Sequence, residues 1–236
     1  MKILAFDSTA TAASVAICEE GKVQTEFFVN AGLTHSRTLM PMLDAALKNT
    51  DSDLKSIDAL AISNGPGSFT GVRIGVAVVK GIAFAENLPC IEVSTLESMA
   101  YNLTLTDCIV CAVMDARCAQ VYSAVFEIKY GEVNRCCQDR AISIADLKSE
   151  LNTSYQGKRI ILVGDGAELC FKEFMDTTLS VELAPAALRF QRASSVAAAA
   201  FDKLSKGEKT KSANELLPAY LRLSQAEREL KKKENK

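Results

Sequence analysis

The chain has 236 residues, a formal net charge of −2 and a single histidine. Hydrophobic residues make up 48% and charged residues 24%, which is ordinary for a globular protein and excludes a disordered one. The near-neutral charge excludes coating of nucleic acid by charge alone, and one histidine excludes any metal site that requires two.

In the first half, turn signals alternate with β-rich runs and are followed by helical periodicity. Strands are predicted at Lys2–Phe6, Ser14–Glu19, Lys22–Val29, Asp58–Asn64 and Pro89–Val93, and helices at Leu39–Leu47, Val72–Ala85 and Leu96–Leu103. Pro41 lies inside the first helical pattern, so that helix is expected to begin near Thr38 or to be kinked there.

The second half repeats this order of elements. Strands are predicted at Thr106–Met114, Ala119–Ile128, Glu132–Gln138 and Arg159–Val163, and helices at Ile144–Leu151 and Ala167–Phe174. Ile3–Asp7 and Cys111–Asp115 are both apolar strands that end in Asp. The matched order predicts a duplicated α/β unit.

We therefore divide the chain into an N-terminal lobe at residues 1–104, a C-terminal lobe at residues 105–222 and a basic, flexible tail at residues 223–236. Asp202–Asn214 is predicted to be a surface loop, and Leu216–Leu221 a last ordered segment that docks on the core. The tail is interpreted either as a solvated end or as a contact for RNA.

Localisation and redox state follow from the apolar runs and the cysteines. The apolar run before Asp7 is too short for a signal peptide, and no tract is long enough to span a membrane. We expect a cytoplasmic protein whose eight cysteines are reduced. Cys108 and Cys111 have CxxC spacing, but on a strand they point to opposite faces and cannot bind one zinc ion. No metal site and no cofactor are predicted.

Two loops could hold a ligand. Asp7, Ser8 and Thr9 follow the first strand and could bind a nucleotide, or could cap a tight turn through hydrogen bonds to the backbone. The loop before the second helix could bind an anion or could be a structural turn, and it consists of Gly65, Pro66, Gly67, Ser68, Phe69, Thr70 and Gly71. It lacks the lysine of a Walker-type loop.

The first two helices have unusually broad apolar surfaces. Such surfaces either fill a deep core within the chain or dock a partner. The candidate residues for a partner interface are His35, Leu39, Leu43, Leu47, Val72, Gly75, Val79 and Ile82. His35 is also the only imidazole that could act as a base, although a lone histidine at a helix start is more often a capping or interface residue.

Several segments closely resemble the TsaB (YeaZ) family of bacterial subunits for the biosynthesis of tRNA threonylcarbamoyladenosine. They are Ile3–Thr9, Ser14–Ala16, His35–Ser36, Asn64–Gly75, Asp115–Arg117 and Tyr220–Arg222. The resemblance covers nearly the whole chain, and the Gly65–Gly75 string is its most specific part. It implies duplicated ribonuclease-H-like units of the actin/sugar-kinase/Hsp70 (ASKHA) class.

The resemblance implies a role without catalysis. The related catalytic subunit, TsaD, carries a metal-binding HxEGH segment, and Thr95 and Met99 stand here where its two histidines would be, with only Glu97 retained. The chain would be a scaffold that docks a TsaD-like subunit through a helical bundle and acts with a TsaE-like ATPase. It would contact tRNA through the complex and could form a homodimer when alone.

Two other classes of protein are alternatives to a scaffold. A nucleotide-dependent phosphotransferase or ATPase of the same fold would need a glycine-rich adenosine loop in the second half. Val163–Ala167 is a short candidate, but Asp165 would place negative charge near phosphates. A metallopeptidase is excluded by the single histidine.

Overall fold

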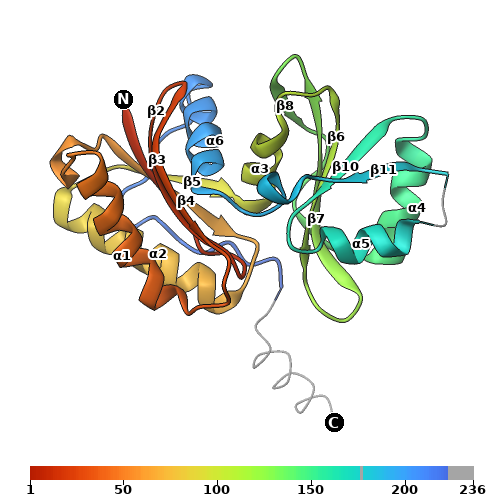
Figure 1. Ribbon diagram of the computed structural model, residues 1–236, viewed down its shortest axis with the longest axis horizontal. Coiled ribbons are helices and arrows are strands. Elements are labelled where there is room, and N and C mark those ends of the chain that lie inside the picture. Colours follow the sequence, from red (N-terminus) through yellow and green to blue (C-terminus); the bar gives the residue numbers. More distant parts are fainter. Residues whose placement is uncertain (176–177, 223–236) are drawn as a thin grey trace, which may run out of the picture.

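The computed structural model describes residues 1–175 and 178–222. Two mixed sheets stand side by side, with helices on both faces of each (Figure 1). The first half contributes β1 (Lys2–Asp7), β2 (Ala13–Glu19), β3 (Lys22–Val29), α1 (His35–Asn49), β4 (Ala59–Gly65), α2 (Phe69–Glu86), β5 (Cys90–Ser94) and α3 (Thr95–Ala100), which continues into the 3-10 helix Tyr101–Leu103. The predicted tail at residues 223–236 lies outside the described residues.

The second half contributes a matching set of elements. They are β6 (Cys108–Asp115), β7 (Gln120–Lys129), β8 (Glu132–Arg135), β9 (Arg140–Ser143), α4 (Ile144–Ser154), β10 (Arg159–Val163), α5 (Ala167–Phe174), β11 (Ser180–Leu183) and α6 (Ala193–Ser205). The sheet orders are β3-β2-β1-β4-β5 and β8-β7-β6-β10-β11. In the first sheet, the central strand β1 pairs antiparallel with β2 and parallel with β4. In the second, the central strand β6 pairs antiparallel with β7 and parallel with β10. The predicted duplication is confirmed.

The two halves exchange one helix each. α1 and α2 cover one face of the first sheet, and α6, from the second half of the chain, covers the other face. α3, from the first half, packs on the second sheet, whose opposite face is covered by α4 and α5. Figure 1 shows α6 beside the first sheet and α3 beside the second. Grouped by these contacts, α6 belongs with the first lobe rather than with the predicted lobe at residues 105–222.

Several predicted boundaries differ from those observed. α1 begins at His35 and contains Pro41, whose missing N–H leaves the carbonyl of Arg37 without its helical partner. Both residues are exposed, so water can hydrate that carbonyl. α6 has no counterpart among the predicted elements, and its last turn includes Asp202–Ser205, the start of the predicted surface loop. β9 and β11 are four-residue strands at sheet edges and were also missed.

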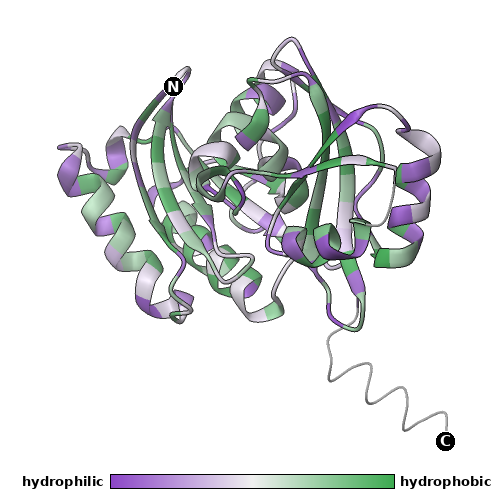
Figure 2. Ribbon diagram, turned by 45° about the vertical axis from the view of Figure 1, so that its right-hand side comes forward, coloured by the Kyte–Doolittle hydropathy of each residue, from purple (hydrophilic) through white to green (hydrophobic). Residues whose placement is uncertain are grey.

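Cys108 and Cys111 illustrate how strand alternation decides burial. Cys108 points into the cluster shared with α3, whereas Cys111 points into the cluster under α4 and α5. This is the arrangement expected from the period of two along a strand. Figure 2 shows that hydrophobic residues are concentrated in the sheets, while hydrophilic residues are frequent on the helices. Within the described ranges, no helix is both long and apolar enough to cross a bilayer.

The described part of the chain ends with an irregular segment that we call the C-terminal strap, residues 206–222. It returns to the first lobe, where the backbone of Lys211 pairs with Cys90 at the edge of β5. Leu216 is fully buried in the core under α1 and α2. The backbone N–H of Ala219 donates to the carbonyl oxygen of Asn64 at 2.8 Å. The expectation that Leu216–Leu221 docks on the core agrees with these contacts.

Candidate functional site

The turn after β1 is closed by hydrogen bonds within the chain. Asp7 Oδ1 accepts bonds from the backbone N–H and the hydroxyl of Thr9, both at 2.9 Å. Ser8 Oγ donates to the carbonyl oxygen of Gly71 at 2.9 Å. Asp7, Ser8 and Thr9 are all fully buried. Asp7 thus caps the turn, as one of the two interpretations of this segment has it, whereas the Ser8 hydroxyl bonds to the start of α2.

The glycine-rich string is shaped to lie on this turn. A Cβ at Gly67 would be 2.3 Å from the carbonyl oxygen of Thr9, and one at Gly71 would be 2.1 Å from that of Ser8. A Cβ at Gly75 would be 2.3 Å from Ser8 Oγ. Side chains at these positions would overlap with the turn. The spacing of the three glycines therefore allows the amino-terminal part of α2 to pack directly on the turn after β1.

Only part of the predicted loop is a loop. Gly65 is the last residue of β4, and Pro66 and Gly67 connect that strand to the helix. Ser68 is the N-cap of α2 and accepts a bond from the N–H of Gly71 at 3.3 Å. Phe69, Thr70 and Gly71 form the first turn of α2, so the helix begins before the predicted Val72. A capping serine shifts the helix start toward the glycines because it satisfies an otherwise unpaired N–H.

A cleft of about 600 Å³ separates the lobes beside this turn. Its first wall comes from the residues before α1 and the start of α2, and its second from Asp115, Arg117, Tyr122 and Asp165. Burial raises the pKa of Asp165, whose Oδ1 accepts a bond from Gln191 at 3.0 Å. Burial thus favours the uncharged form of Asp165, and the Asp115 carboxylate on the same wall is paired with Arg117 at 3.4 Å.

His35 lies between the turn and the cleft. It is the first residue of α1, and its Nε2 donates to the carbonyl oxygen of Ala10 at 2.7 Å. Its ring also faces Gly71, where a Cβ would lie 3.2 Å from His35 Cδ2. With 9% of its surface exposed, His35 joins α1 to α2 and to the turn inside the chain.

Most of the predicted partner-interface residues are part of the chain's own core. Leu39 and Val79 are 0% exposed. The other buried members are His35, Leu43, Val72, Gly75 and Ile82, while Leu47 is half-buried. The apolar faces that these side chains form pack on the first sheet. These buried side chains therefore fill a deep core within the chain, and their contact with a partner stays a prediction.

The outward faces of the same helices are exposed. On α2 the exposed residues include Arg73, Ala77, Gly81 and Phe84, spaced three or four apart so that they share one face. On α1 they include Arg37, Met40, Asp44 and Lys48. Phe84 is 78% exposed and Met40 49%. We call these eight residues the α1–α2 outer face; large apolar groups and small residues occur there together, which is uncommon for a solvated helix surface.

The segment compared with the metal-binding motif has other contacts. Thr95 and Met99 are fully buried, and Met99 packs in the cluster beneath the second sheet. Glu97 forms ion pairs with Arg135 and Lys203. Among residues 1–175 and 178–222, no three His, Cys, Asp or Glu side chains are grouped in a way that could hold a metal ion.

Some contacts near the cleft were not foreseen from the sequence. Tyr220, in the C-terminal strap, stacks on Phe69 with ring centroids 4.4 Å apart, and its hydroxyl accepts a bond from Arg73 at 2.7 Å. Arg222 donates to the carbonyl oxygen of Ala116 at 2.8 Å. Tyr220–Arg222 is one of the segments that carry the family resemblance, but its contacts are more than a hundred residues away in the chain, which no local pattern predicts.

Comparison with known proteins agrees with this architecture. The model of the TsaD family, described as tRNA N6-adenosine threonylcarbamoyltransferase, matches residues 29–230. The tRNA threonylcarbamoyladenosine biosynthesis protein TsaB of Bacillus subtilis is 29% identical over 229 residues, covering 96% of each chain. The TsaB protein of Escherichia coli is 40% identical over 129 residues, covering 54% of this chain and 55% of its own.

Solved structures show the same relationship. YeaZ from Pseudomonas aeruginosa superposes with a TM-score of 0.79 at 28% identity, covering 93% of this chain and 99% of that one. A dehydratase component A from Acidaminococcus fermentans superposes with a TM-score of 0.51 at 11% identity, which shows a shared fold alone. The two matching sheets are those of duplicated ASKHA units. The chain therefore belongs to the family that the TsaD model describes, on its TsaB (YeaZ) branch.

Proposed function

We propose that the chain takes part in the biosynthesis of threonylcarbamoyladenosine in tRNA as the non-catalytic partner of a TsaD-like transferase. The transferred group would go to the adenosine next to the anticodon of tRNAs that read codons beginning with A. The observation that carries the proposal is the α1–α2 outer face, which combines the exposed Phe84 and Met40 with the small residues Ala77 and Gly81. Small residues let a partner's helices approach closely, and the large apolar groups supply buried area.

The location of this face supports the same assignment. The ends of α1 and α2 that carry His35 and Phe69 border the cleft, and the opposite ends, near Lys48 and Glu86, border a second surface hollow. The two helices thus run side by side and in the same direction. A pair of helices presented in this way can form a four-helix bundle with an equivalent pair on a related subunit. A TsaE-like ATPase, tRNA and a second copy of the chain are further proposed partners of such an assembly.

Ala77→Glu tests the proposal. The side chain at position 77 is exposed, so the free chain should fold normally, whereas docking would bury an unpaired carboxylate. Co-purification with the TsaD-like subunit of the same organism should be lost. Thr153→Glu on the exposed surface of α4 is the matched control and should bind normally. Nucleoside analysis of tRNA from cells that carry each variant should show threonylcarbamoyladenosine lost only with Ala77→Glu.

Two results would overturn the proposal. One is normal assembly of the Ala77→Glu variant with the transferase; the other is modification of tRNA by the isolated chain. Val79→Glu is no test of docking, because Val79 is 0% exposed and the charge would disrupt the core of the free chain.

The alternative function for the cleft is that of a phosphotransferase or ATPase. Of the turn at Asp7–Thr9, only Thr9 lines the cleft, and its buried hydroxyl is bonded to Asp7, while Asp165 lines the opposite wall. ATP hydrolysis by the isolated chain that is lost in Asp165→Asn would favour this alternative over the scaffold.

A further inference from the structure

The two lobes meet where α3 packs against α6, and we call this contact the seam. α3 and the following 3-10 turn, on the second lobe, lie against α6, on the first. Three polar contacts join them. Tyr101 Oη donates to Asp202 Oδ2 at 2.8 Å, Ser195 Oγ donates to Asn102 Oδ1 at 2.5 Å, and Lys203 Nζ lies 3.8 Å from Glu97 Oε2.

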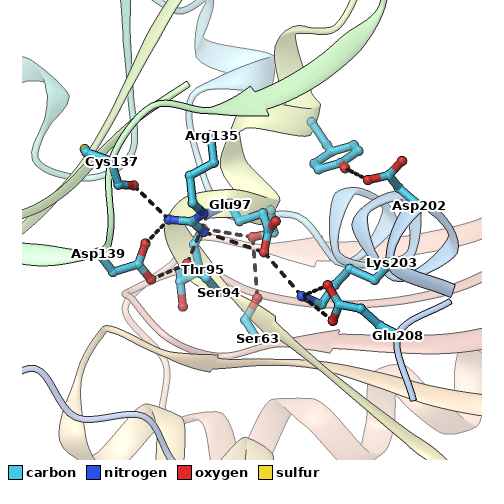
Figure 3. A network of polar contacts seen from close by, with 12 residues as sticks. Ser63, Ser94, Thr95, Glu97, Arg135, Cys137, Asp139, Asp202, Lys203 and Glu208 are labelled. Atoms are coloured by element: carbon cyan, nitrogen blue, oxygen red, sulfur yellow. Dashed lines mark hydrogen bonds and ion pairs between the residues drawn. The ribbon is translucent and has the colours of Figure 1, made fainter. Parts of the chain in front are cut away.

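Glu97 is the centre of a larger network, drawn in Figure 3. The same oxygen that faces Lys203 lies 3.6 Å from Arg135 Nη2. Arg135 Nη1 in turn donates to Asp139 Oδ1 at 2.5 Å, and Lys203 pairs with Glu208 at 2.9 Å. The charges alternate in sign along the whole series, from Glu208 to Asp139.

The network is closed by the cap of α3. Ser94 Oγ donates to Asp139 Oδ2 at 2.5 Å and accepts a bond from the backbone N–H of Glu97 at 3.2 Å. The Arg135 guanidinium also lies 4.8 Å from the centre of the Phe126 ring, which holds it against the second sheet. The side chains of Glu97 and Lys203 are each 20% exposed, so water screens them less than it screens an ordinary surface pair.

We propose that this seam is an inter-lobe lock in which Glu97 holds Arg135 of the second lobe and Lys203 of the first, so that the chain behaves as one rigid body. Without the Glu97 charge, two cations would face each other across the seam, and the pair would favour separation of the lobes. Two-lobed α/β proteins commonly close around a ligand by rotating about their connections. A lock at this seam opposes that motion and suits a chain whose role is to present a fixed surface. The lock does not depend on the proposed partner.

Hydrogen exchange of the isolated chain tests the lock. Glu97→Gln keeps the shape of the side chain and removes its charge, and it should accelerate amide exchange in α6 and β8 about tenfold while leaving α4 and α5 unchanged. Glu182→Gln in β11 is the matched control. It removes a charge that is 49% exposed and paired with Arg159 outside the seam, and it should leave exchange across the seam unchanged. Wild-type exchange rates in α6 of the Glu97→Gln variant would overturn the proposal.

A second measurement covers the case in which Glu97→Gln fails to fold. Arg135→Gln and Lys203→Gln are made singly and together, and denaturant unfolding is measured for each. The two side chains share Glu97 as a common ionic partner, so their effects should be non-additive in the wild-type background. Strictly additive effects would show that Glu97 does not couple the lobes, whatever the behaviour of the docking variants.

Discussion

At the scale of single residues, packing explains why glycines occur at set positions in the Gly65–Gly75 string. Gly71 and Gly75 are helical residues whose missing Cβ atoms leave room for Ser8. Neither lies in the left-handed region, so their requirement is one of space and not of backbone conformation. The string that carries the resemblance to the family most specifically is thus a packing surface between α2 and the turn after β1.

Gly71→Ala should lower the free energy of unfolding by about 1–3 kcal/mol, because the added methyl group would overlap with the Ser8 carbonyl. Gly81→Ala in the same helix is the control: nothing lies within 4 Å of its Cβ position, and helix propensity predicts a gain of about 0.5–1 kcal/mol. Urea unfolding of the two variants measures the difference. Equal effects would contradict the packing role of Gly71.

The buried carboxyl of Asp7 makes the stability of the fold depend on pH. Burial raises the pKa of its carboxyl above the usual 3.8. The folded state therefore keeps a proton that the unfolded chain releases, so stability is present below pH 3.8 and is lost as the pH rises through the folded pKa. In Asp7→Asn the amide oxygen can still accept the bonds from Thr9. This variant should gain stability over wild type as the pH rises from 3.8, as measured by urea unfolding at several pH values. A constant difference would contradict this assignment.

At the scale of elements, the C-terminal strap shows how one buried side chain can fix an irregular segment. Leu216 is 0% exposed, and the next residue, Leu217, is 62% exposed. Around them, Lys80 Nζ donates to the carbonyl oxygen of Leu216 at 3.2 Å, and the N–H of Leu217 donates to Glu92 Oε1 at 2.9 Å. The strap is thereby held against α2 and β5.

Leu216→Ala should destabilise the chain by about 2–5 kcal/mol, since it leaves a cavity in the core of the first lobe. Leu217→Ala, at the adjacent exposed position, should change stability by less than about 0.5 kcal/mol. Thermal unfolding compares the two, and hydrogen exchange in residues 211–221 reports on the strap itself. Similar costs for both variants would mean that the strap is not anchored through Leu216.

At the scale of the whole molecule, the eight cysteines divide by burial. Cys118 and Cys136 are exposed. In contrast, burial raises the pKa of Cys18 and of Cys170 to about 12. A thiol reacts as its thiolate, so the buried cysteines are protected both by their lack of contact with solvent and by their raised pKa.

A thiol reagent at pH 8 should therefore modify Cys118 and Cys136 rapidly in the native chain, and all eight cysteines after denaturation in guanidinium. Peptide mapping by mass spectrometry identifies the sites. Rapid labelling of Cys170 in the native chain would show that the core beneath α5 opens more readily than the packing indicates.

Local patterns were enough to predict the duplicated order of elements, because strand and helix periods are carried by neighbouring residues. The exact agreement at β10 and α5, and the opposite directions of Cys108 and Cys111, follow from those periods. The composition of the string at Gly65–Gly71 likewise indicated a turn that ends in a capped helix. These properties belong to the sequence by itself.

The tertiary structure decided which apolar faces are covered. Val79 and Ala77 lie two residues apart on α2, yet one is core and the other surface, because the first sheet packs on only one side of the helix. The exchange of α3 and α6, and the meeting of Glu97 with Lys203, join residues about a hundred positions apart. Such contacts arise from how whole elements pack, and helix or strand periodicity describes only the element that carries it.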